Sequence, residues 1–211
     1  MKSYSVAHTN APWAEAGGWP LESTPLISAD AKAELKSAFC VIDEALLSQR
    51  YLGVLALVHQ KLFPRVDPCW GQFRDGPAFI KLHGKRLKEL PSPAEASELA
   101  INAMKWLNEA VLGLHGNLDP AFIASEIVYM LLHAHPFVDG NGRVARAIGT
   151  WVLLRAGYEQ LSDLRTYSHE RSEQYFGAIS AREASPTRPE RWHEFFEEMV
   201  GHCFRIPIRS K

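Results

Sequence analysis

The chain has 211 residues, of which 46% are hydrophobic, and this length and composition suit one well-buried globular core. Lysine and arginine number 23 against 24 aspartate and glutamate, so the net charge of −1 gives no support to general nucleic-acid or membrane binding. The sequence has no apolar run of about 18 residues and no signal-peptide pattern at its start. We therefore expect a soluble, cytoplasmic protein with no nucleic-acid or membrane partner, with secretion as an effector left open.

The cysteines are few and widely spaced, at Cys40, Cys69 and Cys203. Their odd number and the lack of metal-type pairing favour reduced thiols over a disulfide framework. This pattern agrees with a cytosol-like compartment.

The chain opens with a segment that lacks helical periodicity. Residues 1–27 are rich in Pro, Gly and Ala, and we expect them to form an extended lead-in to a single helical domain over residues 28–211. Ser28 is suited to cap a helix, and apolar residues recur at helical spacing after it. A second helix is predicted over residues 49–62, because Pro64 stops it.

The pattern changes after Pro64, where Pro and Gly punctuate short apolar pieces such as residues 78–80. We predict a small β-hairpin at about residues 70–88. Basic residues gather in it, and on its own such a cluster is usually a solvated face. The cluster consists of Lys81, His83, Lys85, Arg86 and Lys88.

Two strong helix starts follow the hairpin. Ser92, Pro93 and Glu95 have the spacing of an N-cap, a first-turn proline and a capping box, and predict a helix over residues 92–114. Asp119 and Pro120 repeat the cap-then-proline signal for a buried helix that leads into His135.

The last third of the chain also reads as helical. A helix that starts after residue 140 should end at Gly157, which is suited to a C-cap. Later helices are expected over residues 168–183 and 189–204. The predicted fold class is therefore all-α, a helical bundle with one small hairpin.

The segment with most chemistry is residues 135–146, HPFVDGNGRVAR. His135 can accept a proton from a hydroxyl nucleophile, because imidazole titrates near neutrality. Asp139 is a hard oxygen ligand suited to Mg²⁺. Gly140 and Gly142 let backbone N–H groups approach an anion, and Asn141 can offer its side-chain amide to a phosphate oxygen.

Two arginines complete the segment. Arg143 and Arg146 are three residues apart on the helix that follows the turn, so both can face one ligand with donors matched to phosphate. Alone, either a histidine or an Asp-Gly-Asn-Gly turn is more often structural. Their coincidence in order, before a helix, favours a phosphate-handling site.

Segment 135–146 resembles the signature of the Fic family, His-Pro-Phe-x-Asp/Glu-Gly-Asn-Gly-Arg-x-x-Arg, at every specified position. The resemblance extends over about residues 51–199 and includes segment 71–74. Two positions depart from the family, Val128 where a histidine is frequent and Ala134 where a bulky aliphatic residue is frequent. We interpret both as packing variation.

The resemblance implies a Fic-like helical bundle with the hairpin as a flap that docks an extended segment of a protein substrate. It implies a protein adenylyltransferase that moves AMP from ATP to a Ser, Thr or Tyr hydroxyl. His135 would be the catalytic base and Asp139 the Mg²⁺ ligand. The residues assigned to nucleotide binding are Gly140, Asn141, Gly142, Arg143 and Arg146.

Many Fic proteins carry a segment Ser/Thr-x-x-x-Glu-Gly/Asn, whose glutamate blocks the second motif arginine. The nearest spacing here is Thr166 to Glu170, but Arg171 follows where Gly or Asn is expected. We therefore expect a small antitoxin-like partner that supplies the glutamate in trans, as in a toxin–antitoxin pair. The rival is a chain without an inhibitor because its target is foreign.

Three other functions stay open. The first is a Doc-like kinase or another phosphodiester-type transferase, although that branch departs from the second glycine of the turn and Gly142 is intact. The second is a non-catalytic nucleotide-binding module. The third is a metal hydrolase built on His133, His135 and Asp139, which lacks a third histidine at ligand spacing.

Overall fold

The computed structural model describes residues 4–8, 42, 50–63, 71–82 and 85–205, with backbone only at 4–8, 81–82 and 85–87. The predicted helix after Ser28 and most of the predicted lead-in lie outside these residues. The chain divides into two compact units. The first is Met1–Trp106 with Met130–Val144, and the second is Leu107–Tyr129 with Ala145–Lys211. The predicted single domain over residues 28–211 stays a prediction.

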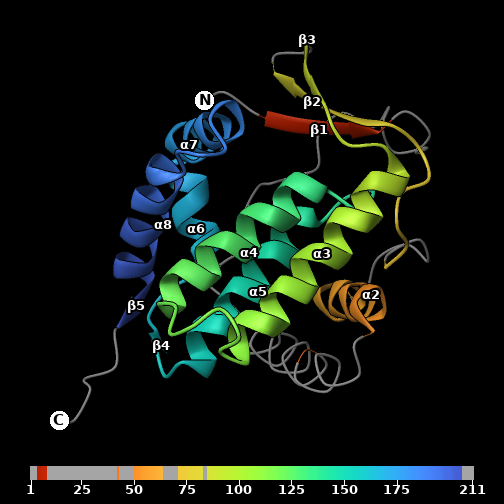
Figure 1. Ribbon diagram of the computed structural model, residues 1–211. Helices are drawn as coiled ribbons and strands as arrows, with labels where there is room; N and C mark the ends of the chain where they lie inside the picture. The colour runs from red at the N-terminus through yellow and green to blue at the C-terminus, as the bar shows by residue number, and fades with distance from the viewer. Residues whose placement is uncertain (1–3, 9–41, 43–49, 64–70, 83–84, 206–211) are drawn as a thin grey trace, which may run out of the picture. The chain divides into compact units, whose positions relative to one another are not determined.

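The structure is mainly helical with a small antiparallel sheet, which confirms the predicted fold class (Figure 1). The helices are α2 (Tyr51–Leu62), α3 (Pro93–Val111), α4 (Pro120–Ala134), α5 (Asn141–Arg155), α6 (Leu164–Glu170), α7 (Ser172–Ala184) and α8 (Glu190–Cys203). The strands are β1 (Tyr4–His8), β2 (Ala78–Leu82), β3 (Lys85–Glu89), β4 (Glu159–Gln160) and β5 (Phe204–Arg205).

The predicted capping signals are realised at the starts of α3 and α4. The Ser92 N–H donates to Glu95 Oε2 at 2.8 Å, and the Glu95 N–H donates to Ser92 Oγ at 3.3 Å, which is a capping box. Asp119 Oδ1 accepts the N–H of Ala121 at 2.8 Å. At the end of α5, Gly157 adopts a left-handed φ of 87°, as a C-cap glycine does.

One predicted helix is wrong in its extent. The helix expected over residues 168–183 is two helices, α6 and α7, with Arg171 between them in a non-helical conformation. The earlier start follows from Asp163, whose Oδ1 accepts the N–H of Arg165 at 2.9 Å and caps α6.

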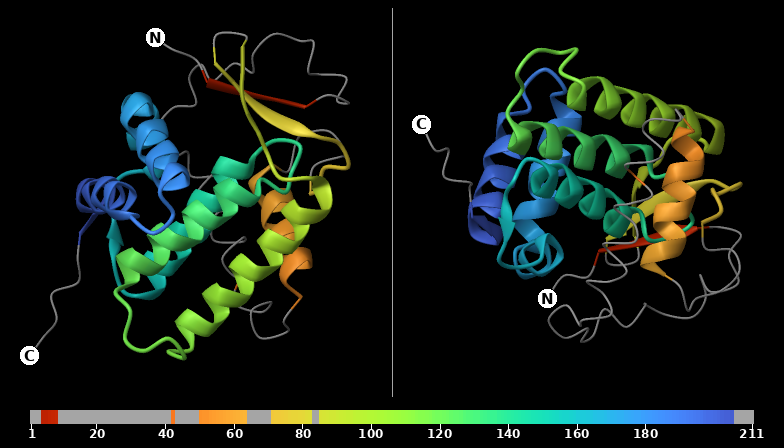
Figure 2. Two further views of the ribbon diagram at one scale, coloured as in Figure 1. Left: turned by 45° about the horizontal axis from the view of Figure 1, so that its top comes forward. Right: turned by 90° about the horizontal axis from the view of Figure 1, so that it is seen from below.

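The predicted hairpin is confirmed and gains a strand. β2 and β3 pair antiparallel, with a register shift between Ile80 and Lys81. β1, from the predicted lead-in, pairs antiparallel with the other edge of β2, so the order is β1-β2-β3 (Figure 2). Leu90 extends the hairpin, because its N–H donates to the Ala78 carbonyl at 2.9 Å. Because β3 is the last strand in the order β1-β2-β3, it forms one outer edge of this sheet.

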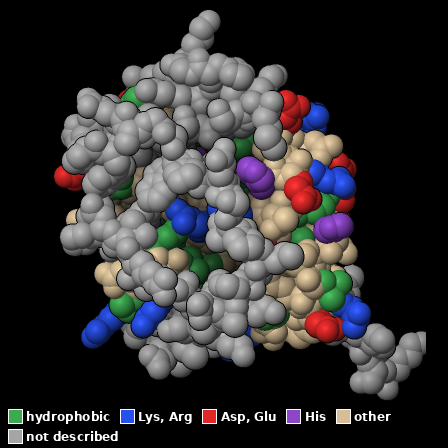
Figure 3. All heavy atoms as spheres, turned by 180° about the vertical axis from the view of Figure 1, so that it is seen from behind, with side chains coloured by type: hydrophobic (Ala, Val, Ile, Leu, Met, Phe, Trp, Pro, Cys, Tyr) green, Lys and Arg blue, Asp and Glu red, His purple; other side chains and the backbone are tan. Residues whose placement is uncertain are grey.

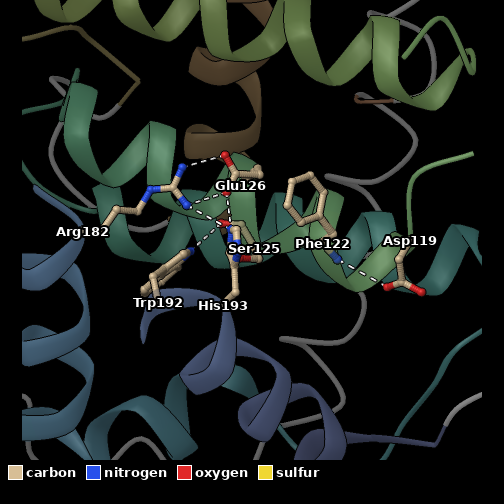
Figure 4. Close-up of polar contacts among 7 residues, drawn as sticks. All are labelled: Asp119, Phe122, Ser125, Glu126, Arg182, Trp192 and His193. Carbon is tan, nitrogen blue, oxygen red and sulfur yellow. Dashed lines mark hydrogen bonds and ion pairs between the residues drawn. The ribbon is translucent and has the colours of Figure 1, made fainter. Parts of the chain in front are cut away.

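In the second unit, an ionic cluster joins α4, α7 and α8 (Figure 4). The Arg182 guanidinium makes a bidentate pair with Glu126, one arm at 2.6 Å, and His193 Nε2 lies 2.5 Å from Glu126 Oε1. The Arg182 and Glu126 side chains are only 10% and 14% exposed. Burial by itself raises the pKa of Glu126, but the hydrogen bonds from Arg182 and His193 outweigh it and leave the pKa below its ordinary value.

The described surface carries charges of both signs. On the face drawn in Figure 3, acidic and basic side chains intermingle on the part formed by described residues, in keeping with the balanced composition. None of the described helices has both the length and the apolar character needed to cross a membrane. Cys203 is a buried free thiol.

Arg182→Met should lower the free energy of unfolding by roughly 3 kcal/mol near neutral pH, because it leaves a buried carboxylate without its main partner. The lowered pKa of Glu126 means that the ion pair stabilises the fold above the ordinary carboxyl pKa. This stabilisation is lost as pH falls through the folded-state value. Thermal melting should therefore show a large deficit at neutral pH that shrinks in acid.

The control for this prediction is Arg188, which lies just before the start of α8, because Arg188→Met removes an arginine that is exposed. Its melting temperature should stay close to that of the unaltered chain. A deficit for Arg182→Met that is the same at neutral and acid pH would contradict the assignment.

Candidate functional site

The histidine of segment 135–146 sits at the junction between α4 and the loop that leads to α5. His135 has a φ of 49°, in the left-handed region, and its N–H donates to the Leu131 carbonyl at 3.1 Å. A non-glycine residue in this region is uncommon and strained, and such strain concentrates at functional positions. The side chain of His135 is mostly buried. The fold therefore holds this histidine in a backbone conformation that stability alone does not favour.

A buried arginine outside the segment anchors the loop backbone. Arg74 Nε donates to the His135 carbonyl at 2.8 Å, and the Arg74 N–H donates to the Pro136 carbonyl at 2.9 Å. Its other guanidinium nitrogens donate to the carbonyls of Gly76, at 3.0 Å, and Pro91. Burial lowers the pKa of Arg74. One side chain thus joins the loop, the start of the hairpin and the start of α3.

A buried histidine on α2 holds the next part of the loop. The Gly71 N–H donates to His59 Nδ1 at 3.1 Å, so Nδ1 is the acceptor and Nε2 carries the hydrogen. Nε2 then donates to the Asp139 carbonyl at 3.0 Å. Burial lowers the pKa of His59, which keeps this neutral tautomer at physiological pH.

Arg74 and His59 were not predicted as site residues. Segment 71–74 belongs to the family resemblance, but nothing in the local pattern around either residue distinguishes it from an ordinary polar residue. Their role depends on contacts 61 and 80 residues away in the chain.

Asn141 closes the loop from inside. The Phe137 N–H donates to Asn141 Oδ1 and Asn141 Nδ2 donates to the Phe137 carbonyl, each at 2.9 Å. The predicted donation from the Asn141 amide to phosphate is thus replaced, for one of its two hydrogens, by a bond that shapes the turn. The Phe137 ring is buried and stacks on Phe73 with centroids 5.0 Å apart. The Phe137 side chain therefore fills the apolar interior beneath the loop.

Gly140 is required by both conformation and space. Its φ is 79°, and a Cβ there would lie 2.8 Å from His59 Nε2 and 2.9 Å from Phe63 Cε2. α5 begins at the next residue, and the first N–H groups of a helix have no acceptor within it. The predicted glycine turn therefore lies at a helix N-terminus, as an anion site requires.

The predicted metal ligand and the first arginine face each other. Asp139 Oδ2 and Arg143 Nη2 are 3.6 Å apart, and the two side chains are 38% and 33% exposed. The Arg143 guanidinium carbon also lies 3.7 Å above the Phe63 ring. A half-exposed pair of this kind contributes little stability, so both groups can exchange partners with a solute at small cost.

The structure brings most of the predicted residues together in the first unit, in the loop after α4 and the first turn of α5, namely His135, Asp139, Gly140, Asn141, Gly142 and Arg143. Arg146 lies further along α5, in the second unit, where its Nη1 donates to the Tyr175 hydroxyl at 3.3 Å. Among the described residues, no group of three or more His, Cys, Asp or Glu side chains could hold a metal ion. This does not support a metal hydrolase that uses His133, His135 and Asp139 together.

Residues 52–153 match the model of the Fic/DOC family, so this part of the chain is a Fic/DOC family domain. The protein adenylyltransferase Fic of Aedes aegypti is 29% identical over 147 residues, which cover 69% of this chain and 26% of that protein. The chain thus spans about a quarter of the length of this curated relative.

Solved structures share the fold. A Fic family protein from Desulfovibrio desulfuricans G20 has a TM-score of 0.58 at 21% identity, with 83% of this chain and 53% of that chain covered. BepC of Bartonella tribocorum, a VirB-translocated effector solved with bound AMPPNP, has a TM-score of 0.54 at 18% identity, with 83% and 89% covered.

Gly140→Ala should lower the free energy of unfolding by about 2–4 kcal/mol, for two reasons. Alanine is strained at the positive φ of this position, and its methyl group would collide with the side chains of His59 and Phe63. The matched control is Gly113→Ala, at a φ of 75° with nothing within 4 Å, which should cost only about 1 kcal/mol. Urea unfolding measures both, and calorimetry with Mg·ATP should show lost affinity for Gly140→Ala alone. Equal costs with unchanged ATP affinity would show that the turn is not a packed anion site.

Proposed function

We propose that this chain, whose residues 52–153 form a Fic/DOC family domain, transfers AMP from ATP to a Ser, Thr or Tyr hydroxyl of a target protein. The observation that carries the proposal is segment 135–144, the loop after α4 with the first turn of α5, which presents a histidine, a carboxylate and an arginine at the N-terminus of α5. Its sequence keeps every specified position of the Fic signature. A relative named protein adenylyltransferase and a fold neighbour solved with AMPPNP support the reaction class and the nucleotide.

In this mechanism, His135 takes the proton of the target hydroxyl, and the hydroxyl oxygen attacks the α-phosphorus of ATP. The new phosphorus–oxygen bond joins AMP to the target, and the bond to pyrophosphate breaks. Backbone N–H groups at Gly140, Gly142 and the start of α5 stabilise the charge that develops on the phosphate oxygens. Arg143 and Arg146 hold the β- and γ-phosphates that leave.

Asp139 fits a magnesium ligand, because it is a single, half-exposed carboxylate beside the turn and Mg²⁺ is usually bound by one or two carboxylates together with substrate phosphates. Bound there, Mg²⁺ would neutralise phosphate charge. Arg143, which pairs with Asp139 in this structure, would then be released toward the nucleotide.

The alternatives differ in what they transfer. A Doc-like kinase would move the γ-phosphoryl group, and a binding module would move nothing. The intact Gly142 and the complete set of motif residues favour the adenylyltransferase.

We also propose that the target pairs with the outer edge of β3. β1 already pairs with one edge of β2, and β3 pairs with the other, so within the described sheet β3 leaves an outer edge. Main-chain pairing can hold an extended segment of any sequence there. Three residues of the basic cluster, Lys85, Arg86 and Lys88, belong to β3, which favours an acidic segment in the target.

A further part of the proposal is an inhibitor supplied in trans. Thr166 and Glu170 lie on α6, and among the described residues no carboxylate forms an ion pair with Arg146. A small partner that offers a glutamate to Arg146 would block the place of the terminal phosphate. Co-expression with genomic neighbours tests this, because no growth defect for the chain alone and no change in labelling with any neighbour would exclude the partner.

His135→Ala should reduce labelling of protein by ATP that carries the label on its α-phosphate by about 10²–10⁴-fold, because the proton acceptor is removed. Affinity for Mg·ATP should change little. The control is His133→Ala, which removes a histidine of α4 outside the signature and should keep labelling. If protein is labelled by ATP that carries the label on its γ-phosphate, and not by α-labelled ATP, the chain is a kinase. Loss of labelling to the same degree in both variants would contradict the role of His135.

Reversing two charges on β3, Lys85→Glu with Lys88→Glu, should reduce labelling of lysate proteins several-fold, because an acidic segment would be repelled from the strand. Calorimetric affinity for Mg·ATP should stay unchanged. Lys61→Glu with Lys105→Glu makes the same charge change on exposed positions of α2 and α3 and should label normally. Equal labelling by the two double variants would refute docking on β3.

A further inference from the structure

The second arginine of segment 135–146 is held by a tyrosine from a distant helix of the same unit. Arg146 Nη1 donates to the Tyr175 hydroxyl at 3.3 Å, and the guanidinium carbon lies 5.9 Å from the centre of the Tyr175 ring. Arg146 is on α5 and Tyr175 is on α7, 29 residues later. We infer that Tyr175 is a positioning residue that fixes Arg146 for the terminal phosphate of ATP, a role that rests on the proposed function.

The side chains that contact the two motif arginines differ in charge. Arg143 faces the carboxylate of Asp139, whereas Arg146 faces a neutral hydroxyl. Tyr175 is buried, and burial raises the pKa of its hydroxyl, so the group stays protonated at physiological pH. A neutral acceptor orients the guanidinium without cancelling its charge. The full positive charge of Arg146 is thus kept for an anion.

The burial of Arg146 is also incompletely compensated by hydrogen bonds. Its Nε is buried and, among the described residues, has no hydrogen-bond partner. A buried donor without a partner costs about 1–3 kcal/mol. The fold therefore maintains this arginine at a position that stability does not favour, which is typical of a residue kept for a ligand.

Tyr175 is itself held on several sides. Its ring packs against Trp192 and Phe195 of α8 with centroids 6.0 Å and 5.9 Å away. Trp192 Nε1 in turn donates to the Ser125 carbonyl of α4 at 3.0 Å (Figure 4). α7 is also tied to α4 by the ion pair of Arg182 with Glu126. The hydroxyl that Arg146 meets consequently has little freedom to move.

If Tyr175 acts through Arg146, its hydroxyl should matter for nucleotides that reach the arginine and not for those that do not. Tyr175→Phe removes the oxygen and keeps the ring. Calorimetry on the full chain should show about tenfold weaker binding of Mg·ATP, with AMP affinity unchanged within about twofold. In the transfer reaction, the KM for ATP should rise by a similar factor with a much smaller change in kcat.

A double-variant comparison separates positioning from general damage. In the Arg146→Ala background, adding Tyr175→Phe should leave the ratio of ATP to AMP affinity unchanged. The matched control is Tyr129→Phe, because Tyr129 lies beside another arginine of the same unit, with the Arg182 guanidinium 4.0 Å from its ring. That variant should keep the normal ratio even where thermal melting shows some loss of stability.

The outcomes are distinct. If the unaltered chain binds Mg·ATP no better than AMP, the proposed function fails. If it prefers ATP, and Tyr175→Phe keeps that preference in full, the positioning role is overturned. A loss of preference that is equally large in the Arg146→Ala background also overturns it, because Tyr175 would then act by another route.

Discussion

The functional loop depends on hydrogen bonds to its own backbone carbonyls from buried side chains that lie elsewhere in the chain. Arg74 binds the carbonyl of His135 and, through its N–H, that of Pro136, while His59 binds the carbonyl of Asp139. These contacts use main-chain acceptors, so they set the path of the loop and leave its side chains available for chemistry. The bond from Arg74 to the His135 carbonyl also helps to hold His135 in its left-handed conformation.

The two arginines of α5 have different partners, and the difference agrees with different duties. Arg143 shares a half-exposed ion pair with Asp139, a contact weak enough to be exchanged for the metal and phosphate of the proposed reaction. Arg146 is oriented by the neutral, buried Tyr175 and keeps its charge. In the proposed reaction, one arginine would be released by its ligand and the other is oriented in advance. Preorganised charge of this kind is the largest contribution in many transfer reactions.

The sequence was sufficient wherever the determining contacts are local. The capping box of Ser92 and Glu95, the cap at Asp119 and the C-cap at Gly157 could each be predicted, because their partners lie within a few residues. The candidate site residues of segment 135–146 could also be predicted, because they lie within twelve consecutive residues. The all-α class could be predicted from the helical spacing of apolar residues, and the hairpin from the change of pattern after Pro64.

What the sequence could not supply were contacts between distant segments. The role of His59 depends on a carbonyl 80 residues later, and the role of Tyr175 depends on an arginine 29 residues earlier. The third strand of the sheet, Tyr4–His8, pairs with residues 70 to 78 positions later in the chain. The chemistry of Asn141 alone predicts a contact with phosphate, whereas its hydrogen bonds to Phe137 depend on a turn geometry that propensity does not specify.

The central claim is that this loop transfers an adenylyl group and not another part of ATP. The most direct test is intact-mass and fragment mass spectrometry of proteins from a lysate incubated with the purified chain and Mg·ATP. The account predicts a mass increase of one adenylyl group on a Ser, Thr or Tyr residue, absent with His135→Ala. An increase of one phosphoryl group, or no covalent change although ATP is bound, would contradict it.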